Sequence, residues 1–268
     1  MRILTSLMSL QRGIFLLIGA LLMSQLAFAW APPKREFYEI KVYYLKDQSQ
    51  QERVEKYLKD AYLPALNRAG IRKVGVFKPV PTDTAAGKRL YVLTPMSSLA
   101  QLTEIQDKLS RDKQYAAAGA DYINAAHTDA PYRRIETILL QAFSQMPVMN
   151  APVHKTPVNE RVYELRSYEG HTEKIFRNKV QMFNEGGEVK IFDKLGFNAV
   201  FYGEVLAGSR MPNLMYMTTF ENKASRDAHW NAFRVDPDWK ALSAKPEYKN
   251  NVSKQMIWFL QPTSYSGI

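Results

Sequence analysis

Two segments of the chain carry the same alternating order of an acid, a base and a tyrosine. The order occurs once as Glu164, Arg166 and Tyr168 and once as Glu39, Lys41 and Tyr43. Side chains two positions apart lie on the same face of a β-strand, so each triplet would occupy one face. One interpretation is a polar pocket in which Arg166 holds an anionic group. The other is a pair of structural ion pairs that fix the register of the sheet.

A second group of candidate residues lies further along the chain. Arg226, Trp230 and Phe233 are spaced i, i+4 and i+7, which places them on one side of a helix, and His229 lies beside that side. In the functional interpretation, His229 is an axial ligand or a general base at the mouth of a barrel. In the alternative, Trp230 and Phe233 pack on a sheet and His229 faces solvent.

Other catalytic and metal-binding patterns are missing from the sequence. His127 and His171 lack the spacing of metal ligands, and there is neither a nucleophile elbow nor a phosphate-binding glycine loop. The chain also has no cysteine, which excludes disulfides, thiol nucleophiles and thiolate metal sites. We therefore predict no metal site.

The elements that would position these residues occur twice. The sequence FYEIK at 37–41 recurs as VYELR at 162–166, and LYVLT at 90–94 recurs as MYMTT at 215–219. Tyr38 and Tyr163 are 125 positions apart, and so are Tyr91 and Tyr216. Solenoid repeats have shorter periods, roughly 20–50 residues, so this spacing indicates a duplicated domain. Tyr216 joins the candidate pocket residues of the second half.

Each half is predicted to have the β-α-β-β-α-β order of a ferredoxin-like fold. Strands are predicted over 37–45, 74–77, 88–94 and 135–142, and again over 162–168, 197–205, 213–220 and 255–260. Ser49 followed by Glu52 is typical of a capping box at the start of the first helix, and Gly70 is placed to end it. The sequence DPDW at 236–239 predicts a helix stop and a turn.

A four-stranded antiparallel sheet with both helices on one face leaves its other face uncovered. Two such sheets can cover each other, so we predict an α+β fold in which the halves close one barrel as a pseudo-dimer. The more apolar face of each strand is expected to pack under the helices, which would direct the charged triplets into the barrel. The first repeat would span 30–145, a proline-containing linker 146–158, and the second repeat 159–268.

The first 29 residues are predicted to be a signal peptide. Arg2 and Arg12 accompany an apolar stretch over 13–23, and Ala-Phe-Ala at 27–29 matches the pattern that signal peptidase accepts before Trp30. The apolar run is also long enough for an uncleaved membrane anchor. We expect cleavage and export to the periplasm or the exterior of a bacterial cell, with no stable membrane span afterwards.

The formal net charge of the chain is +10. Lysine and arginine are scattered singly among the acids and form no block of like charge, so we interpret the excess as a solvated basic surface. A basic charge alone is not a binding motif, and we expect no nucleic-acid partner. A homo-oligomer is compatible with the sequence, because two chains can exchange halves or pair further.

Several pieces of the second half occur together in a specific order. They are YELR at 163–166 with Tyr168, PNL at 212–214 before the strand, Arg226 with His229 and Trp230, and DPDW at 236–239. In this order they resemble the NIPSNAP domain family. The first half keeps YEIK at 38–41 and YVL at 91–93 but lacks the last two pieces, so it is predicted to be a degenerate copy.

The resemblance implies the dimeric α/β-barrel fold. The family's activity is unsettled, and the barrel superfamily includes cofactor-independent monooxygenases, haem-handling enzymes and simple binding proteins. Because the sequence has no catalytic motif, we predict a non-catalytic protein that holds a small, mostly apolar ligand or a partner through the barrel, without a cofactor. The alternative is a monooxygenase or haem-handling enzyme that uses His229, Arg166 or tyrosines in the barrel.

Overall fold

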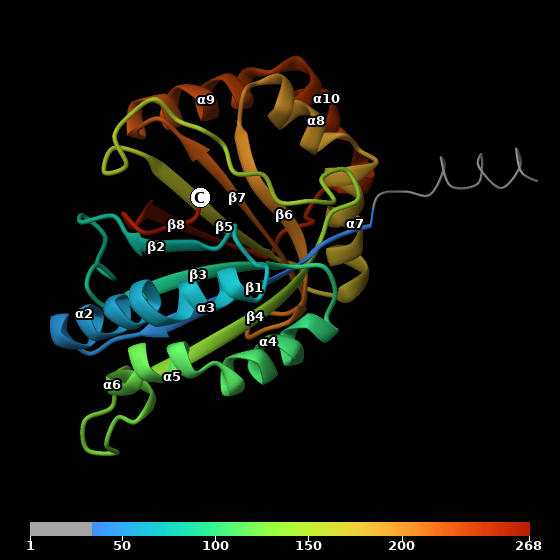
Figure 1. Ribbon diagram of the computed structural model, residues 1–268. Helices are drawn as coiled ribbons and strands as arrows, with labels where there is room; N and C mark the ends of the chain where they lie inside the picture. Colours follow the sequence, from blue (N-terminus) through green and yellow to red (C-terminus); the bar gives the residue numbers. More distant parts are fainter. Residues whose placement is uncertain (1–33) are drawn as a thin grey trace, which may run out of the picture. The chain divides into compact units, whose positions relative to one another are not determined.

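A computed structural model describes residues 34–268 of the chain. The predicted signal peptide, and with it the choice between cleavage and an anchor, lies outside the described residues. Residues 35–268 form one compact unit, whose strands and helices are shown in Figure 1. Among the helices within residues 34–268, none combines the length and the apolar character needed to cross a membrane.

The first half contains four strands and two helical connections. The elements in order are β1 (Phe37–Tyr44), α2 (Gln48–Tyr57), the π-helical turn η1 (Leu58–Tyr62), α3 (Leu63–Arg68), β2 (Gly75–Pro79), β3 (Arg89–Met96), α4 (Ala100–Arg111), α5 (Lys113–Ala118), α6 (Ala120–Ile123) and β4 (Arg134–Ala142). The predicted β-α-β-β-α-β order is confirmed. The short helices α5 and α6 are additional, because segments of four to six residues carry too little periodicity to be recognised.

The second half repeats this order. Its elements are β5 (Val162–Glu169), α7 (Glu173–Asn184), α8 (Glu188–Lys194), β6 (Asn198–Ala207), β7 (Asn213–Phe220), α9 (Lys223–Val235), α10 (Pro237–Ala244), the 3₁₀ turn η2 (Pro246–Tyr248) and β8 (Lys254–Pro262). Gly187, with φ 93°, separates α7 from α8, because glycine adopts this left-handed conformation without a steric penalty.

The strands of residues 34–268 close into a single barrel in the order β1-β3-β2-β8-β5-β7-β6-β4. All neighbours in the barrel are antiparallel, and the pairings of the two halves are equivalent: Glu39 lies opposite Thr94, and Glu164 lies opposite Thr218. Two seams join the halves, one between β2 and β8 and the other between β4 and β6. The predicted fold class, two ferredoxin-like halves that close one barrel, is confirmed.

The helices form two outer layers around this barrel. In Figure 1, α2 to α6 lie against the strands of the first half, and α8 to α10 lie over β6 and β7 of the second. Apolar side chains fill the space under each layer: Val54, Leu58 and Leu66 in the first half, and Phe183, Phe192 and Trp230 in the second. Each half therefore buries one face of its sheet under its own helices.

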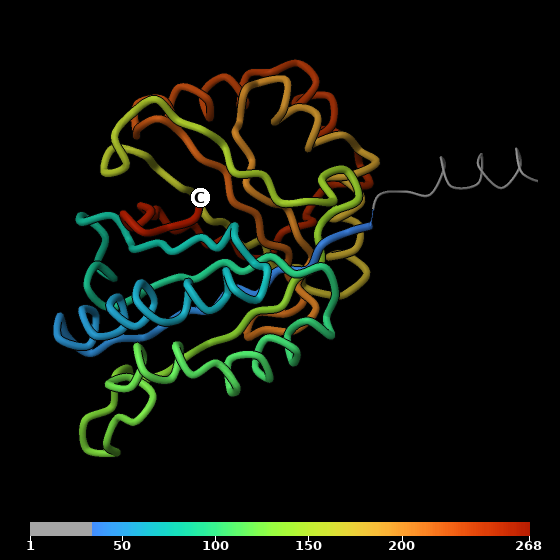
Figure 2. The backbone as a smooth tube through the Cα atoms, viewed as in Figure 1, coloured from blue at the N-terminus to red at the C-terminus, as the bar shows by residue number. Residues whose placement is uncertain are grey.

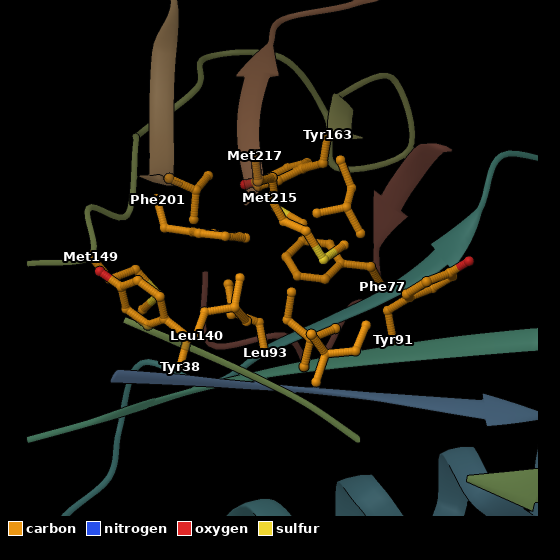
Figure 3. Close-up of a cluster of buried hydrophobic side chains, with 14 of the residues drawn as sticks. Tyr38, Phe77, Tyr91, Leu93, Leu140, Met149, Tyr163, Phe201, Met215 and Met217 are labelled. Atoms are coloured by element: carbon orange, nitrogen blue, oxygen red, sulfur yellow. The ribbon is translucent and has the colours of Figure 1, made fainter. Parts of the chain in front are cut away.

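The other face of each sheet lines the inside of the barrel. Figure 3 shows Tyr38, Phe77, Tyr163 and Phe201 pointing toward one another there. Tyr38 and Phe201 have ring centroids 5.2 Å apart, and those of Phe77 and Tyr163 are 4.9 Å apart. Aromatic pairs at this spacing are favourable beyond the area that they bury. Each half contributes two of the four rings, so the inner core depends on both halves.

The prediction that the charged triplets point into the barrel is wrong. Tyr163 and Leu165 face the barrel interior, and Glu164 and Arg166 lie under the helices instead. The interior of the barrel receives side chains from all strands and is the larger apolar core, so the apolar face of β5 is buried there. The charged face is accommodated under α9, where a helix supplies partners for it.

The predicted offset of 125 positions between the repeats is correct for the first strand of each half. For the third strand of each half it is one residue too long. Thr94 and Thr218 are equivalent in the barrel and lie 124 positions apart. As a result, Tyr91 faces the barrel interior and Tyr216 faces the helices. A shift of one residue moves every side chain of a strand to the other face, so the two tyrosines are not counterparts.

Two helix boundaries also differ from the prediction. The first helix is capped by Asp47, whose side chain accepts a hydrogen bond from the Gln50 N–H at 3.1 Å, and Ser49 is already within the helix. The 236–239 segment stops α9 but also starts α10: Asp236 accepts from the N–H groups of Asp238 and Trp239, and Pro237 takes the first helical position. Gly70 ends α3 with φ 92°, as predicted.

The segment between β4 and β5 packs against the barrel along its length. It can be followed as the yellow-green tube in Figure 2. Met149 is buried in the inner core, and the Asn150 N–H donates to the Val200 carbonyl oxygen at 2.9 Å. Further along, the His154 side chain is buried and its Nε2 lies 3.0 Å from the Thr219 hydroxyl oxygen. The predicted linker is therefore anchored to both halves.

Candidate functional site

The Glu164 carboxylate is the centre of a buried polar cluster between β5 and α9. It accepts hydrogen bonds from Arg166 Nε at 2.6 Å, from Arg226 Nε and Nη2 at 2.7 and 2.8 Å, and from Trp230 Nε1 at 2.9 Å. The side chain of Glu164 is fully buried. Burial opposes the charged form, but the bonds to Arg226 and Arg166 outweigh it and hold the pKa of Glu164 below its ordinary value.

Helix α9 positions two of these donors. Its N-terminus is capped by Asn222, whose side chain accepts from the Ser225 N–H at 2.9 Å. Arg226 and Trp230 follow one turn apart, so both reach Glu164. The guanidinium of Arg166 then lies over the Trp230 ring, 3.7 Å from its centroid, which is a cation–π contact.

The cluster continues under α7 and α8 through hydroxyl groups. Arg166 Nη1 donates to the Tyr168 hydroxyl at 2.9 Å, and this hydroxyl lies 2.8 Å from that of Tyr216. Burial raises the pKa of both tyrosines well beyond the neutral range, so both stay protonated. Nearby, Lys179 donates to Glu188 at 2.7 Å. The predicted residues Glu164, Arg166, Tyr168, Tyr216, Arg226 and Trp230 are thus brought together.

The geometry of this cluster is that of a structural network. Every donor is directed at another side chain of the chain, and both carboxylate oxygens of Glu164 are occupied. The counterpart in the first half is looser: Lys41 Nζ lies 3.6 Å from Glu39 and 3.5 Å from the Tyr62 hydroxyl. In both halves the triplet ties a central strand to its helix layer, on the face of the sheet that is turned away from the barrel interior.

His229 lies apart from the cluster, half-buried on a flank of α9. Its Nδ1 is 2.7 Å from the Ser225 carbonyl oxygen, and its ring packs against Phe197 and Phe220. His127 and His171 are exposed. Within residues 34–268, no group of three or more His, Asp or Glu side chains has an arrangement that would hold a metal ion.

A cavity of about 100 Å³ lies on the other face of the sheet, inside the barrel. We call it the barrel cavity. Its walls are mainly apolar and include Val42, Ile138, Leu165, Val205, Met215 and Trp258. An apolar cavity of about 150 Å³ binds benzene, so a space of this order admits one ring or a short alkyl chain. At the opposite end of the barrel, Tyr38, Phe77, Tyr163 and Phe201 fill the interior.

A few polar side chains lie at the open end of the barrel cavity. The Tyr44 hydroxyl donates to Glu136 Oε2 at 2.6 Å, and the Ser209 hydroxyl donates to the other oxygen of Glu136. Burial, followed by the contact with Glu136, raises the pKa of Tyr44 to about 12, so its hydroxyl is protonated at neutral pH. Asn213, at the start of β7, also lines the cavity and is 2% exposed; its Nδ2 donates to Ser167, and its Oδ1 has no partner in the described part of the chain.

A second, wider cavity of about 690 Å³ adjoins the first and opens to solvent. We call it the basic mouth. Four of the side chains that line it are cations: Lys88, Arg89, Arg133 and Arg134. Three residues line both cavities: Tyr44, Arg89 and Trp258. The basic mouth therefore lies directly beside the barrel cavity, at the end of the barrel where β1 ends.

Sequence reasoning missed these residues. It placed the pocket on the charged face of β5, and the cavity lies on the apolar face. The one signal in the sequence was a pair of basic doublets, Lys88-Arg89 and Arg133-Arg134, each at the start of a predicted strand. Strands β3 and β4 both flank β1, so their starts meet at one end of the barrel.

Comparison with known families adds to this geometry. Residues 163–267 match the family model for NIPSNAP. The second half of the chain is a NIPSNAP domain. The match begins in β5 and runs to the end of β8, so the domain includes the Glu164 cluster and the part of the barrel wall that carries Leu165, Met215 and Trp258. No curated protein matches the chain by sequence.

Solved structures similar to all or part of the barrel come from several bacteria. A proposed monooxygenase from Lactobacillus acidophilus has 12% identity and a TM-score of 0.56, over 85% of this chain and 94% of that one. A proposed monooxygenase from Fusobacterium nucleatum has 9% identity and a TM-score of 0.51, over 86% and 93%. A NIPSNAP family protein from Agrobacterium tumefaciens has 19% identity over 45% of this chain and 98% of that one, with a TM-score of 0.36. At these identities the first two show that the fold is shared.

A haem bound through His229 does not fit this NIPSNAP domain. The imidazole lies in the outer helix layer, and no histidine within residues 34–268 lines the barrel cavity or the basic mouth. The barrel cavity, at about 100 Å³, is also too small for a porphyrin. The proposed axial-ligand role of His229 is therefore not compatible with the fold.

Proposed function

We propose that this protein is a non-catalytic binding protein that holds a small, mostly apolar molecule in the barrel cavity. The observation that carries the proposal is the cavity itself: an apolar space inside a well-packed barrel, filled at one end and open at the other. Protein interiors contain few voids larger than a water molecule, so an apolar space of this size is a binding site by default.

The lining of the cavity favours binding over catalysis. The carboxylate among its residues, Glu136, already accepts hydrogen bonds from Tyr44 and Ser209. A general base needs a free acceptor within reach of the substrate, and Glu136 would first have to give up these bonds. Because a signal peptide is predicted, we propose that the protein binds its ligand in the periplasm or outside the cell.

The alternative function is a cofactor-independent monooxygenase that uses the same cavity. Two structural neighbours are proposed monooxygenases, and the support that they lend is the fold, which does not select an activity. Oxygen consumption by the purified protein with a bound aromatic ligand would favour this alternative. Binding without any turnover favours the binding protein.

A cavity-filling substitution tests the proposal. Val205 lies on the cavity wall and is 4% exposed, so Val205→Phe should fill the space and abolish the binding of butanol in a calorimetric titration. Val235→Phe is the matched control, because Val235 is 65% exposed at the end of α9. Val42→Phe, which fills the cavity from β1, is a second variant in case the first one is unstable. Unchanged butanol binding in folded Val205→Phe and Val42→Phe would overturn the proposal.

A further inference from the structure

The basic mouth has an excess of positive charge that the protein itself does not neutralise. Lys88, Arg89, Arg133 and Arg134 have no carboxylate within 4.0 Å among residues 34–268. The neighbouring acid, Asp83, is directed at the protein backbone, where it accepts from the Ala85 N–H at 2.7 Å. Four cations and one acid therefore line this mouth, and positive charge is in excess there.

Other arginines of the chain are neutralised differently. Arg53 pairs with Asp121 and Asp129 at 2.7 and 2.9 Å, and Arg68 pairs with Asp112 at 2.6 Å. These pairs join helices on the outside of the first half. At the basic mouth, like charges from the start of β3 and the start of β4 converge on one opening instead. Bringing like charges together costs free energy unless an anion neutralises them.

Arg89 connects this charge to the apolar interior. It lines both the basic mouth and the barrel cavity, and its guanidinium lies 5.2 Å from the centroid of the Tyr44 ring. A molecule with its apolar part against Leu165 and Ile138 would place the other end at this guanidinium. An arginine guanidinium is planar and matches a carboxylate or a phosphate with two parallel hydrogen bonds.

From this arrangement we propose that the natural ligand is a small amphipathic anion. Its one ring or short alkyl chain occupies the barrel cavity, and its carboxylate or phosphate binds Arg89, Arg133 and Arg134 at the basic mouth. This inference rests on the proposed function and deepens it, because it names the chemical class of the ligand. Size limits the apolar part, since the cavity is about 100 Å³, and charge selects the head group.

A series of ligands with one chain and different head groups tests this inference. Butyrate, butyl phosphate, butanol and butylamine, whose chains are short enough for the barrel cavity, are titrated into the full chain by calorimetry at low salt. We expect butyrate or butyl phosphate to bind at least about tenfold more tightly than butanol, and butylamine to bind most weakly. The comparison of butyrate with butyl phosphate identifies the head group. The advantage of the anion should shrink at high salt, because salt screens exposed charges.

Charge-removing variants locate the head group. Arg133→Gln/Arg134→Gln and, separately, Arg89→Gln should reduce the ratio of the affinity for butyrate to the affinity for butanol. Arg111→Gln/Lys113→Gln is the matched control, because both side chains are exposed on the outer helices and the net charge changes equally. Equal affinities of butanol and butyrate for the unmodified protein would overturn the inference and leave the proposed function intact. Failure of all four ligands to bind would overturn both.

Discussion

The indole Nε1 of Trp230 donates a hydrogen bond to Glu164 at 2.9 Å, although the two residues are 66 positions apart in the chain. This bond ties the middle of α9 to the central strand β5. Both groups are buried, so neither has water as an alternative partner. An unsatisfied buried carboxylate or indole would cost free energy, and the helix layer is therefore fixed on the sheet in one position.

Removing the charge of Glu164 should destabilise the fold strongly. In Glu164→Gln, Arg166 and Arg226 would face an uncharged amide under α9. Breaking a buried ion pair in this way costs about 3 kcal/mol or more, so we expect a loss of that order in the free energy of unfolding. Denaturant unfolding followed by tryptophan fluorescence measures it.

Glu39→Gln is the control for this substitution, since Glu39 is buried at the equivalent position of the first half. Its contact with Lys41 is longer, at 3.6 Å, and the loss of stability should be smaller. Equal losses in the two variants would contradict the assignment of Glu164 as the centre of a multi-donor network.

The contact between Glu221 and the linker should make stability depend on pH. The Thr156 hydroxyl and N–H donate to Glu221 at 2.6 and 3.0 Å and lower its pKa from 4.5 to about 2. Because the pKa is lower in the folded state, this contribution is present above about pH 4.5 and is lost as the pH falls toward 2. The free energy of unfolding of the unmodified protein should therefore fall more steeply over this range than that of Glu221→Gln.

The measurement is a set of denaturant titrations between pH 7 and pH 2. Glu160→Gln, at an exposed position of the same segment, is the control and should follow the unmodified protein. If the curves of all three proteins run parallel, Glu221 does not anchor the linker.

His229→Ala should leave ligand binding unchanged. The imidazole contacts Ser225, Phe197 and Phe220 in the outer layer and has no contact with the barrel cavity. We expect a modest loss of stability, about 1 kcal/mol, from the lost packing and the lost hydrogen bond. Titration with butyrate and butanol checks the binding. A large loss of affinity with a normal melting temperature would place His229 in the site after all.

The N-terminal segment provides a prediction about processing. If the signal peptide is cleaved after Ala29, the protein recovered from the periplasm or the medium of a bacterial host begins at Trp30. Intact-mass measurement distinguishes this species from the full chain. A membrane-bound product that still begins at Met1 would support the anchor instead.

Alternation along β5 predicted correctly that Glu164, Arg166 and Tyr168 share a face. The alternation did not predict which of the two faces lines the barrel interior. Both faces of β5 are buried, so the alternation fits either orientation of the strand. The choice depends on the partners of each face: Arg226 and Trp230 come from a helix more than 60 positions away, and Phe77 comes from the other half of the chain.

The repeat was detected from the sequence, and its exact alignment was not. The similarity of the tyrosines at 91 and 216 suggested one offset, but strand pairing sets the offset of the third strand to one residue less. Likewise, the basic mouth forms where the starts of β3 and β4 meet beside β1. A ligand site assembled from loops and strand ends of different elements has no local sequence pattern, and Arg89 and Arg134 come together because both pair with Tyr44 at the end of β1.

The order of the strands around the barrel has a consequence for how a newly made chain reaches its native state. β8 lies between β2 and β5, so the ring of strands cannot close before the second half has been synthesised. Until then, the inner faces of β1 to β4, with Tyr38, Phe77 and Leu140, have no covering sheet. Nascent chains with such exposed apolar strands aggregate readily. We expect the emerging first half to be held by chaperones, and folding to complete only after translation, in a late and cooperative step.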